Sequence, residues 1–436
     1  MVKKACFILL LLSAAAIQSC GVYAKYQNPD PVDVDAAALH LPQWREFYSD
    51  PFLQELLDSA IAHNTDLATA ALRLSQADEN VKASKLAYIP SLFFTPSGGI
   101  SVKSGQAAGY TYNIPLSIGW NFGAPGTLFA RKHQAEARRI QARDNFNAVR
   151  SELISQVAAD YYMLQMLDGK VDILENTISI WSRALEIQRE FLRSGKAFYS
   201  SVAQMESKLI DARQDLIQAK ADIAVWEKAI CLLTAEPIHI VRRSKAGEFQ
   251  EPYLAEKEVN LSALRLRPDV RAAERDLEIT YYLTSEAKSA FYPSINLSGD
   301  FGWPGLVNGV LSLAQPIFSQ GSLKCRLNVS RMDEEIAQLQ FKQTLLQAAT
   351  EVSQALADCK LHSEKSELFS EQQKIQEKAC RVVEELLRDG KANYLELIKA
   401  QEKLLSAQLG EVESRYRARE ATIQLYKSLG FSIPEV

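Results

Sequence analysis

Two short segments in the first half of this sequence each match a segment in the second half without gaps, about two hundred residues farther along the chain. Ala87–Ser91 matches Ala290–Ser294 at an offset of 203 residues, and Leu192–Ala197 matches Leu387–Ala392 at an offset of 195 residues. Self-similarity at a nearly constant spacing indicates a structural repeat. The chain is therefore predicted to be a tandem duplication, in which each half folds into the same order of elements.

Each half is predicted to contain three helical stretches. An amphipathic helix comes first, and a very long polar helix with little Gly or Pro follows it after a segment of a different period. The long helix stops at a glycine turn, Gly195 or Gly390, and a return helix follows. The expected ranges are Leu53–Leu86, Thr127–Arg193 and Ser200–Leu233 in the first half, and Leu261–Lys288, Ser322–Arg388 and Tyr394–Leu429 in the second.

The long helices must be packed along their length. A helix of about 65 residues is ~100 Å long, several times the length of a helix in a globular domain. Apolar residues recur along the first of them at steps of three and four, which is typical of coiled-coil packing. They are Ile154, Val157, Tyr161, Leu164, Leu167, Val171 and Leu174.

Between the helices, each half switches to the alternating pattern of strands. From Tyr110 to Phe122, apolar and aromatic residues alternate with small or polar ones, and Ile295–Trp303 and Leu311–Ala314 repeat the pattern in the second half. Leu92–Val102 supplies the remaining strand. Aromatic residues near strand ends are typical of transmembrane barrels, and the candidates here are Tyr110, Tyr112, Trp120, Phe122 and Trp303. The alternative is a soluble two-hairpin sheet packed on helices.

The strand count predicts an oligomer if the strands span a membrane. Four strands cannot close a barrel, since about eight is the smallest number, and open edges are not tolerated in lipid. The predicted fold class is mainly α with transmembrane β: a long α-helical barrel plus four strands per subunit that form a shared trimeric β-barrel.

The N-terminus carries an export signal. Lys3 and Lys4 precede an apolar run that is too short to span a bilayer and is typical of a cleaved signal peptide. The run ends at Cys20 in a sequence resembling a lipoprotein box, so we expect Cys20 to be acylated. An ordinary cut near Ala24 is the alternative. The expected domains are residues 1–20 as signal peptide, 21–52 as N-terminal segment, 53–250 as first repeat and 251–436 as second repeat.

Composition argues against several classes of function. A net charge of −4, a pI near 5.9 and the absence of a basic block argue against nucleic acid as a partner. After the signal, no window has the apolar length of a transmembrane helix. No phosphate loop, nucleophile motif or metal-type cysteine spacing is present, so no catalytic residue, metal or cofactor is expected.

No site is expected from the cysteines outside the signal peptide or from the histidines, and the histidines are expected to be surface or packing residues. Cys231, Cys325, Cys359 and Cys380 are expected to be free buried thiols, with at most one disulfide through Cys231. The five histidines lack the pairing or acidic neighbour of a metal-binding helix. They are His40, His63, His133, His239 and His362.

Three motifs give the sequence a family resemblance. Arg267–Glu274 resembles an RPDxRAAE motif, Ser201–Glu206 a DVAQAE segment and Leu425–Gly430 an LYKALG ending. Together with the repeat, they are similar to the TolC-like family of outer-membrane efflux factors, in its lipoprotein, NodT-type branch of multidrug and metal efflux channels. The resemblance covers roughly Trp44 to Gly430.

The resemblance implies a homotrimer in outer-membrane lipid whose helices continue the barrel as a periplasmic tunnel. The tunnel docks on a periplasmic adaptor (a membrane fusion protein) and an inner-membrane pump, and it exports small molecules such as drugs, toxic compounds or metal ions. The Gly195 and Gly390 turns then lie at the tips of the helical hairpins, with Arg388 and Tyr394 as candidates for tip contacts. A non-channel periplasmic coiled-coil lipoprotein scaffold is the alternative function.

The resemblance also points to a gate. In the family, carboxylates one helical turn apart constrict the tip of the tunnel, and these positions fall on Glu396 and Lys399. Lys399 departs from this pattern of two carboxylates. Its ammonium group is expected to pair with Glu396, where a second carboxylate would repel it, and this pairing is expected to alter gate tightness or ion preference. An ordinary surface pair at i and i+3 is the alternative.

Overall fold

The computed structural model describes residues 23–27, 42–101, 109–195, 198–248, 264–265, 267–303, 306–389, 391 and 394–430. They separate into two compact units, and each unit draws on both repeats. The first contains residues 23–27, Ala70–Phe146 and Pro268–Leu345, and the second contains the described residues of Val34–Thr69, Asn147–Arg267 and Leu346–Val436. The repeats of the sequence are therefore not separate bodies, and their boundaries at 53–250 and 251–436 stay a prediction.

The predicted first helix is two helices, which corrects the expected range Leu53–Leu86. A short α2 (Trp44–Phe47) is followed by α3 (Pro51–His63) and α4 (Thr65–Leu86), with the break at Asn64. The Asn64 side chain accepts hydrogen bonds from the backbone N–H groups of Asp66 (3.0 Å) and Leu67 (2.9 Å). It also donates to the Leu233 carbonyl (3.0 Å). Asn64 thus caps α4 and joins it to a distant helix.

A buried polar cluster holds the start of α3. The Asp50 carboxylate caps α3 by accepting from the Phe52 N–H (3.0 Å), and it accepts from the Tyr161 hydroxyl (2.6 Å) and the Ser244 hydroxyl. Gln165 donates to the Ser244 Oγ at 2.9 Å. Because these groups are buried and bonded to one another, they fix the start of α3 within the second unit.

In the second repeat, α7 (Pro268–Ser289) begins later than the expected Leu261. Pro268 occupies the first helical position, where its missing N–H and fixed φ suit a helix start. Residues 261–263 lie outside the described part of the chain. Arg267, just before the helix, is 7% exposed and donates to the Ser428 carbonyl (2.9 Å) and the Glu351 carboxylate (2.6 Å). The RPD motif and the C-terminal LYKSLG motif therefore meet at Arg267.

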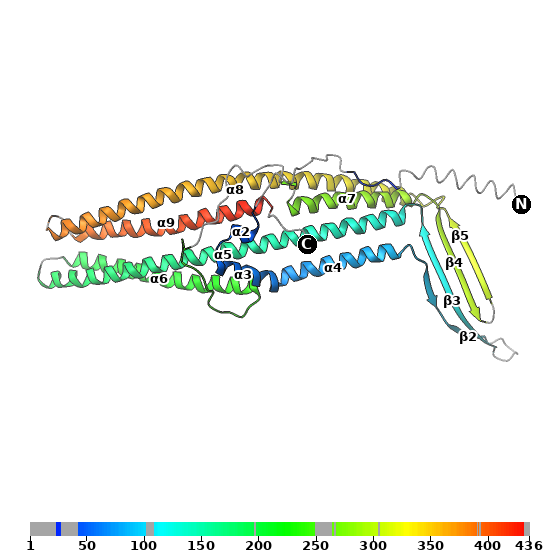
Figure 1. Ribbon diagram of the computed structural model, residues 1–436, viewed down its shortest axis with the longest axis horizontal. Coiled ribbons are helices and arrows are strands. Elements are labelled where there is room, and N and C mark those ends of the chain that lie inside the picture. The colour runs from blue at the N-terminus through cyan, green and yellow to red at the C-terminus, as the bar shows by residue number, and fades with distance from the viewer. Residues whose placement is uncertain are drawn as a thin grey trace. The chain divides into compact units, whose positions relative to one another are not determined.

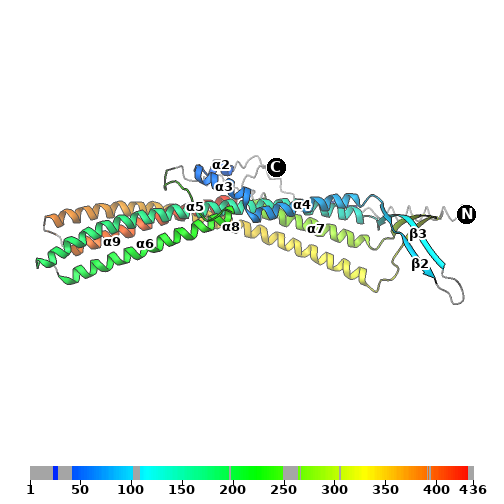
Figure 2. The same cartoon turned by 90° about the horizontal axis from the view of Figure 1, so that it is seen from below.

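The two long helices, α5 (Thr127–Arg193) and α8 (Ser322–Arg388), have the predicted bounds. Each is followed by a return helix, α6 (Tyr199–Thr234) or α9 (Tyr394–Ser428), and α6 runs beside α5 in both views (Figures 1 and 2). Of the predicted core positions on α5, all but Val171 are buried. Among the described residues, no helix combines the length and the hydropathy needed to cross a bilayer.

Two glycines of the second unit lie close to side chains of neighbouring helices. A Cβ atom on Gly410 of α9 would lie 2.7 Å from the Phe369 ring of α8, and one on Gly169 of α5 would lie 3.2 Å from Val412 of α9. Glycine destabilises a helix interior by about 1 kcal/mol relative to alanine. Close packing against Phe369 and Val412 explains why glycine stands at these positions.

The strands form one antiparallel sheet in the first unit. Its main path runs β1 (Ser91–Phe94), β3 (Gly109–Gly123), β4 (Ser294–Trp303) and β5 (Leu306–Ala314), and β2 (Ser97–Ser101) also pairs with β3. Figure 1 shows β3, β4 and β5 side by side. The strand expected from Leu92 to Val102 is divided into β1 and β2. Both keep one register with β3, since Phe94 faces Leu116 and Ser97 faces Asn113.

Candidate functional site

The sheet has one apolar and one polar face. Directly opposed residues of antiparallel strands lie on the same face, and the register pairs Leu92 with Ile118, Leu116 with Phe301, and Leu297 with Trp120 and Leu311. The other face pairs small or polar residues: Ser91 with Gly119, Ser117 with Asp300, and Asn296 with Asn121 and Ser312. The register also places three apolar residues on the polar face as exceptions: Phe93, Leu306 and Val310.

The apolar face is uncovered. The exposed fractions are 64% for Leu92, 65% for Phe94 and 71% for Leu311, so the helices of the first unit do not pack over these side chains. A soluble sheet packed on helices would bury this face. The exposed apolar face is therefore evidence against the soluble-sheet alternative, because exposed apolar area of this kind indicates a contact with lipid or with another protein.

The aromatic candidates lie on β3 and β4. Trp120 and Phe122 pack together with ring centroids 4.4 Å apart, and the Trp120 indole N–H donates to the Tyr88 carbonyl (3.2 Å). The backbones of Tyr110, Tyr112 and Trp303 lie within the strands, but their side chains are outside the described part. Trp120 thus links the sheet to the turn between α4 and β1.

The hairpin tips lie at one end of the second unit, where α5 and α8 end (Figure 1). Gly195 follows α5 with a φ of +72°, a left-handed conformation that glycine adopts without strain. Arg388 is the last residue of α8 and is exposed. Gly390 lies outside the described residues, as does the lipidation candidate Cys20.

Tyr394 begins α9 and contacts the other hairpin. Its ring lies 5.9 Å from that of Phe191 in an edge-to-face arrangement, and burial raises the pKa of the Tyr394 phenol. Phe191 was not among the predicted tip residues. Nor were Phe198 and Tyr199, which are 83% and 73% exposed at the start of α6. Their aromatic character beside the Gly195 turn was the available signal.

The two gate candidates occupy the first turns of α9. Glu396 and Lys399 are both exposed, whereas Leu397 and Ile398 between them are buried. Ile398 packs into a cluster with Trp181 and Leu185 of α5 and residues of α6. The buried pair fixes the rotation of α9, so Glu396 and Lys399 both project away from that cluster.

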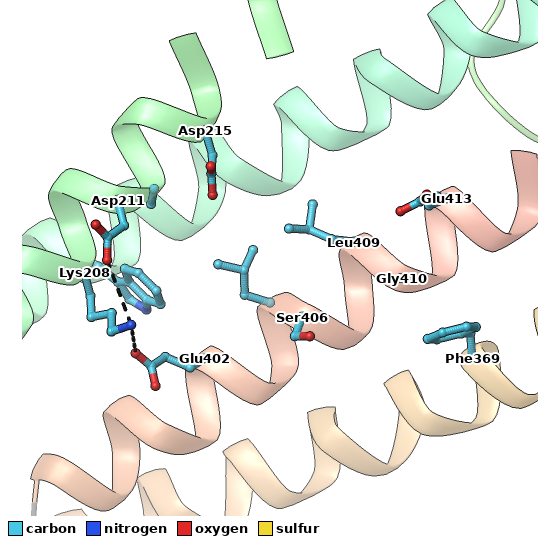
Figure 3. Close-up of a pocket in the computed structure, with 12 residues that line it drawn as sticks. Lys208, Asp211, Asp215, Phe369, Glu402, Ser406, Leu409, Gly410 and Glu413 are labelled. Carbon is cyan, nitrogen blue, oxygen red and sulfur yellow. Dashed lines mark ion pairs between the residues drawn. The ribbon is translucent and has the colours of Figure 1, made fainter. Parts of the chain in front are cut away.

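A groove of about 660 Å³ lies farther along the same helices. Figure 3 shows Lys208 and Asp211 of α6 facing Glu402 of α9, and the Lys208 ammonium lies 3.2 Å from the Glu402 carboxylate. Asp215 and Glu413 also line the groove, which is therefore net negative. This groove was not predicted from the sequence. The available signal was the i, i+3, i+7 spacing of Lys208, Asp211 and Asp215 on one face of α6.

Two helices of the second unit carry exposed apolar stripes. On α8 the stripe recurs every seven residues, and on α6 at steps of seven or eight. The α8 stripe consists of Leu361, Leu368, Ile375 and Val382, and the α6 stripe of Ile210, Ile217, Val225 and Leu232, with exposed fractions from 45% to 80%. Such spacing is typical of a coiled-coil seam without its partner.

Two expectations about the cysteines and histidines need correction. Cys231, Cys325, Cys359 and Cys380 are free thiols, but Cys325 is exposed and Cys359 is half-buried, so only Cys231 and Cys380 are buried as expected. His133 and His239 do have acidic neighbours, with Glu136 at 3.1 Å and Glu236 at 3.5 Å. In the described residues, no group of three or more His, Cys, Asp or Glu side chains is arranged to hold a metal ion.

Comparison with known proteins gives consistent matches over both repeats. The family model described as outer membrane efflux protein matches residues 56–235 and 261–431. The toluene efflux pump outer membrane protein TtgC of Pseudomonas putida is 25% identical, with 97% of this chain and 94% of the relative covered. The probable outer membrane lipoprotein SilC of Salmonella typhimurium is 23% identical, with 89% and 87% covered.

Known structures share the fold as well. The cation efflux system protein CusC of Escherichia coli K12 is 23% identical over 98% of this chain and 99% of the relative. A crystal structure of CusC superposes with a TM-score of 0.84 at 21% identity, covering 93% of this chain and 99% of that one. The two matched segments of the family model also fit the internal repeat. The chain belongs to the outer membrane efflux protein family and is an efflux channel of the outer membrane.

Proposed function

We propose that three copies of this chain form one pore, with a shared barrel of twelve strands in the membrane and a helical tunnel in the periplasm. The observation that carries the proposal is the sheet with an uncovered apolar face and two open edges, formed by β5 on one side and β1 with β2 on the other. Lipid tolerates an apolar face but not unpaired edges, so neighbouring copies must supply the missing pairs.

The exposed helix stripes support the same assembly. The α8 and α6 stripes are different surfaces, so α8 of one copy packs against α6 of the next in a head-to-tail contact. A contact between unlike surfaces generates a closed ring when the rotation closes, whereas a contact of one surface with itself gives a dimer. Three copies supply twelve strands, which exceeds the minimum of about eight for closure.

The tunnel is proposed to meet a periplasmic adaptor and an inner-membrane pump at the hairpin tips. Phe198 and Tyr199 offer exposed aromatic side chains there, and aromatic residues are enriched in protein interfaces. We propose that Glu396 and Lys399 line the closed tip and that Cys20 carries a lipid anchor. The cargo is proposed to be small molecules or metal ions, which pass through without being chemically changed.

The test begins with the purified protein in detergent, which should be a trimer by native mass spectrometry and should give discrete conductance steps in a lipid bilayer. Leu368→Glu places a charge on the α8 stripe and should convert most of the trimer into monomer, because a buried unpaired charge is costly. Ser363→Glu is the matched control, since Ser363 is exposed on α8 away from the stripe. It should leave the trimer intact. A Leu368→Glu variant that assembles like the wild type would contradict this interface.

The scaffold alternative predicts a different result for the strands. Under that alternative, deletion of residues 110–122 leaves the oligomeric state unchanged, because the hairpins only join helical bundles. In the proposed pore the same deletion removes most of β3, to which β1, β2 and β4 all pair. It should therefore abolish both assembly and conductance.

A further inference from the structure

One charged residue occurs within the five described strands. β1, β2, β3 and β5 contain only apolar, small and uncharged polar residues, and β4 contains Asp300. A lone carboxylate among otherwise neutral strands has no cationic partner on those strands. No charge on the strands neutralises it, so its field extends into the medium that its face of the sheet contacts.

The register places Asp300 on the polar face of the sheet. It stands opposite Ser117 of β3 and Asn308 of β5, whereas its neighbour Phe301 stands opposite Leu116 on the apolar face. Asp300 is exposed. Along β4 the same face continues with Ser298 and Asn296, since alternate residues share a face.

Membrane physics fixes which face meets water. Charged side chains on the lipid face of a barrel are destabilising, and barrel interiors are polar. The face of Leu92, Leu116 and Leu311 therefore meets lipid, and the face of Asp300 meets the lumen. In a threefold assembly the three copies of Asp300 lie at one height, and the low-dielectric wall behind them strengthens their field in the lumen.

We propose that Asp300 forms a ring of three carboxylates inside the barrel and that this ring makes the membrane part of the pore prefer cations. The inference rests on the proposed trimeric pore. It concerns a second selective element, separate from the gate candidates Glu396 and Lys399 on α9. The ring attracts cations from the lumen and repels anions, and salt screens its field over about 10 Å at 0.1 M.

The experiment measures the cation-to-anion permeability ratio from reversal potentials across bilayers in a KCl gradient. Asp300→Asn should lower this ratio about two- to fivefold near 0.1 M salt and much less near 1 M, because screening shortens the reach of the charge. Asp300→Lys should shift the ratio further toward anions. Ser298→Asn, on the same strand and face but without a change in charge, should leave it unchanged.

Chemical modification provides a measurement that does not depend on how well the lysine variant assembles. In Asp300→Cys, a water-soluble thiol reagent that adds a sulfonate should restore the cation preference, and one that adds an ammonium should reverse it. The wild type treated in the same way controls for the exposed Cys325.

The outcomes separate the ring from the channel itself. If the wild type conducts but the variants at position 300 have the same permeability ratio as the wild type, the ring is overturned and the proposed pore is not. If water-soluble reagents do not reach the new thiol of the Asp300→Cys variant, the side chain lies on the lipid side, which also overturns the ring. A wild type that neither forms trimers nor conducts overturns the proposed pore, whatever residue stands at that position.

Discussion

Asp160 carries a buried carboxyl group on α5 with a pH-dependent effect on stability. It is 3% exposed, it accepts a hydrogen bond from the Gln156 amide (2.7 Å), and burial raises its pKa to about 6. In the unfolded chain the carboxyl titrates near 3.9. Between these values the folded state binds the proton and the unfolded state does not, so stability rises as the pH falls from about 7 to about 4.

Asp160→Asn should therefore stabilise the protein at pH 7.5 by about 1–3 kcal/mol per subunit, and the gain should vanish near pH 4. Thermal unfolding in detergent at several pH values measures this difference. Asp172→Asn, at an exposed position of the same helix, should show no such dependence. An Asp160→Asn effect that is equal at both pH values would mean that the carboxyl titrates normally.

Residue types were predictable from the sequence, but their partners were not. Arg267 stood out as part of a motif, yet its hydrogen bond to the Ser428 carbonyl joins residues 161 positions apart. Asn64 followed by Thr65 and Asp66 was a readable helix-start signal. The continuous apolar pattern around it concealed the break, and its bond to Leu233 could only be found from the structure.

At the scale of elements, the two faces of the sheet can be tested with neighbouring substitutions. Leu311→Asp places a carboxylate on the apolar face, whereas Ser312→Asp places the same group on the polar face opposite the neutral Asn296. The first should cost up to about 2 kcal/mol per subunit and reduce the trimer recovered from membranes. The second should assemble normally.

Heat-resistant oligomer on a denaturing gel, together with the amount inserted in membranes, measures this difference. Both variants carry the same new charge one residue apart, so general effects of charge cancel. Equal losses for the two substitutions would contradict the assignment of the apolar face to lipid.

The helices were easier to predict than the strands. The ranges of α5 and α8 followed from long stretches with little Gly or Pro that end before a glycine turn. The division of β1 from β2 has a local cause that was overlooked: Pro96 lies between them and has no N–H to donate to the ladder. Thr95, the residue before Pro96, stands opposite Pro115 of β3 in the register that β1 and β2 share.

At the scale of the whole molecule, symmetry multiplies the effect of each charge near the pore axis. In the proposed trimer, Glu396 and Lys399 give three negative and three positive charges at the tip, so their contributions to the field oppose one another. Their side chains are exposed and held in rotation by the buried Leu397 and Ile398. Substitutions at the two positions should therefore change ion preference in opposite directions.

Glu396→Ala leaves the lysines and should shift the permeability ratio toward anions, whereas Lys399→Asp creates six carboxylates and should shift it toward cations. A charge change near a narrow axis is worth about 1 kcal/mol, or roughly fivefold, in low salt. Bilayer recordings measure the ratio, and thermal unfolding checks that the fold is unaffected.

Because Asp300 is on the sheet and these residues are on α9, the double variant Glu396→Ala with Asp300→Asn should combine both shifts if the two act as separate filters in series. If neither tip substitution alters the current, the constriction lies elsewhere along the tunnel.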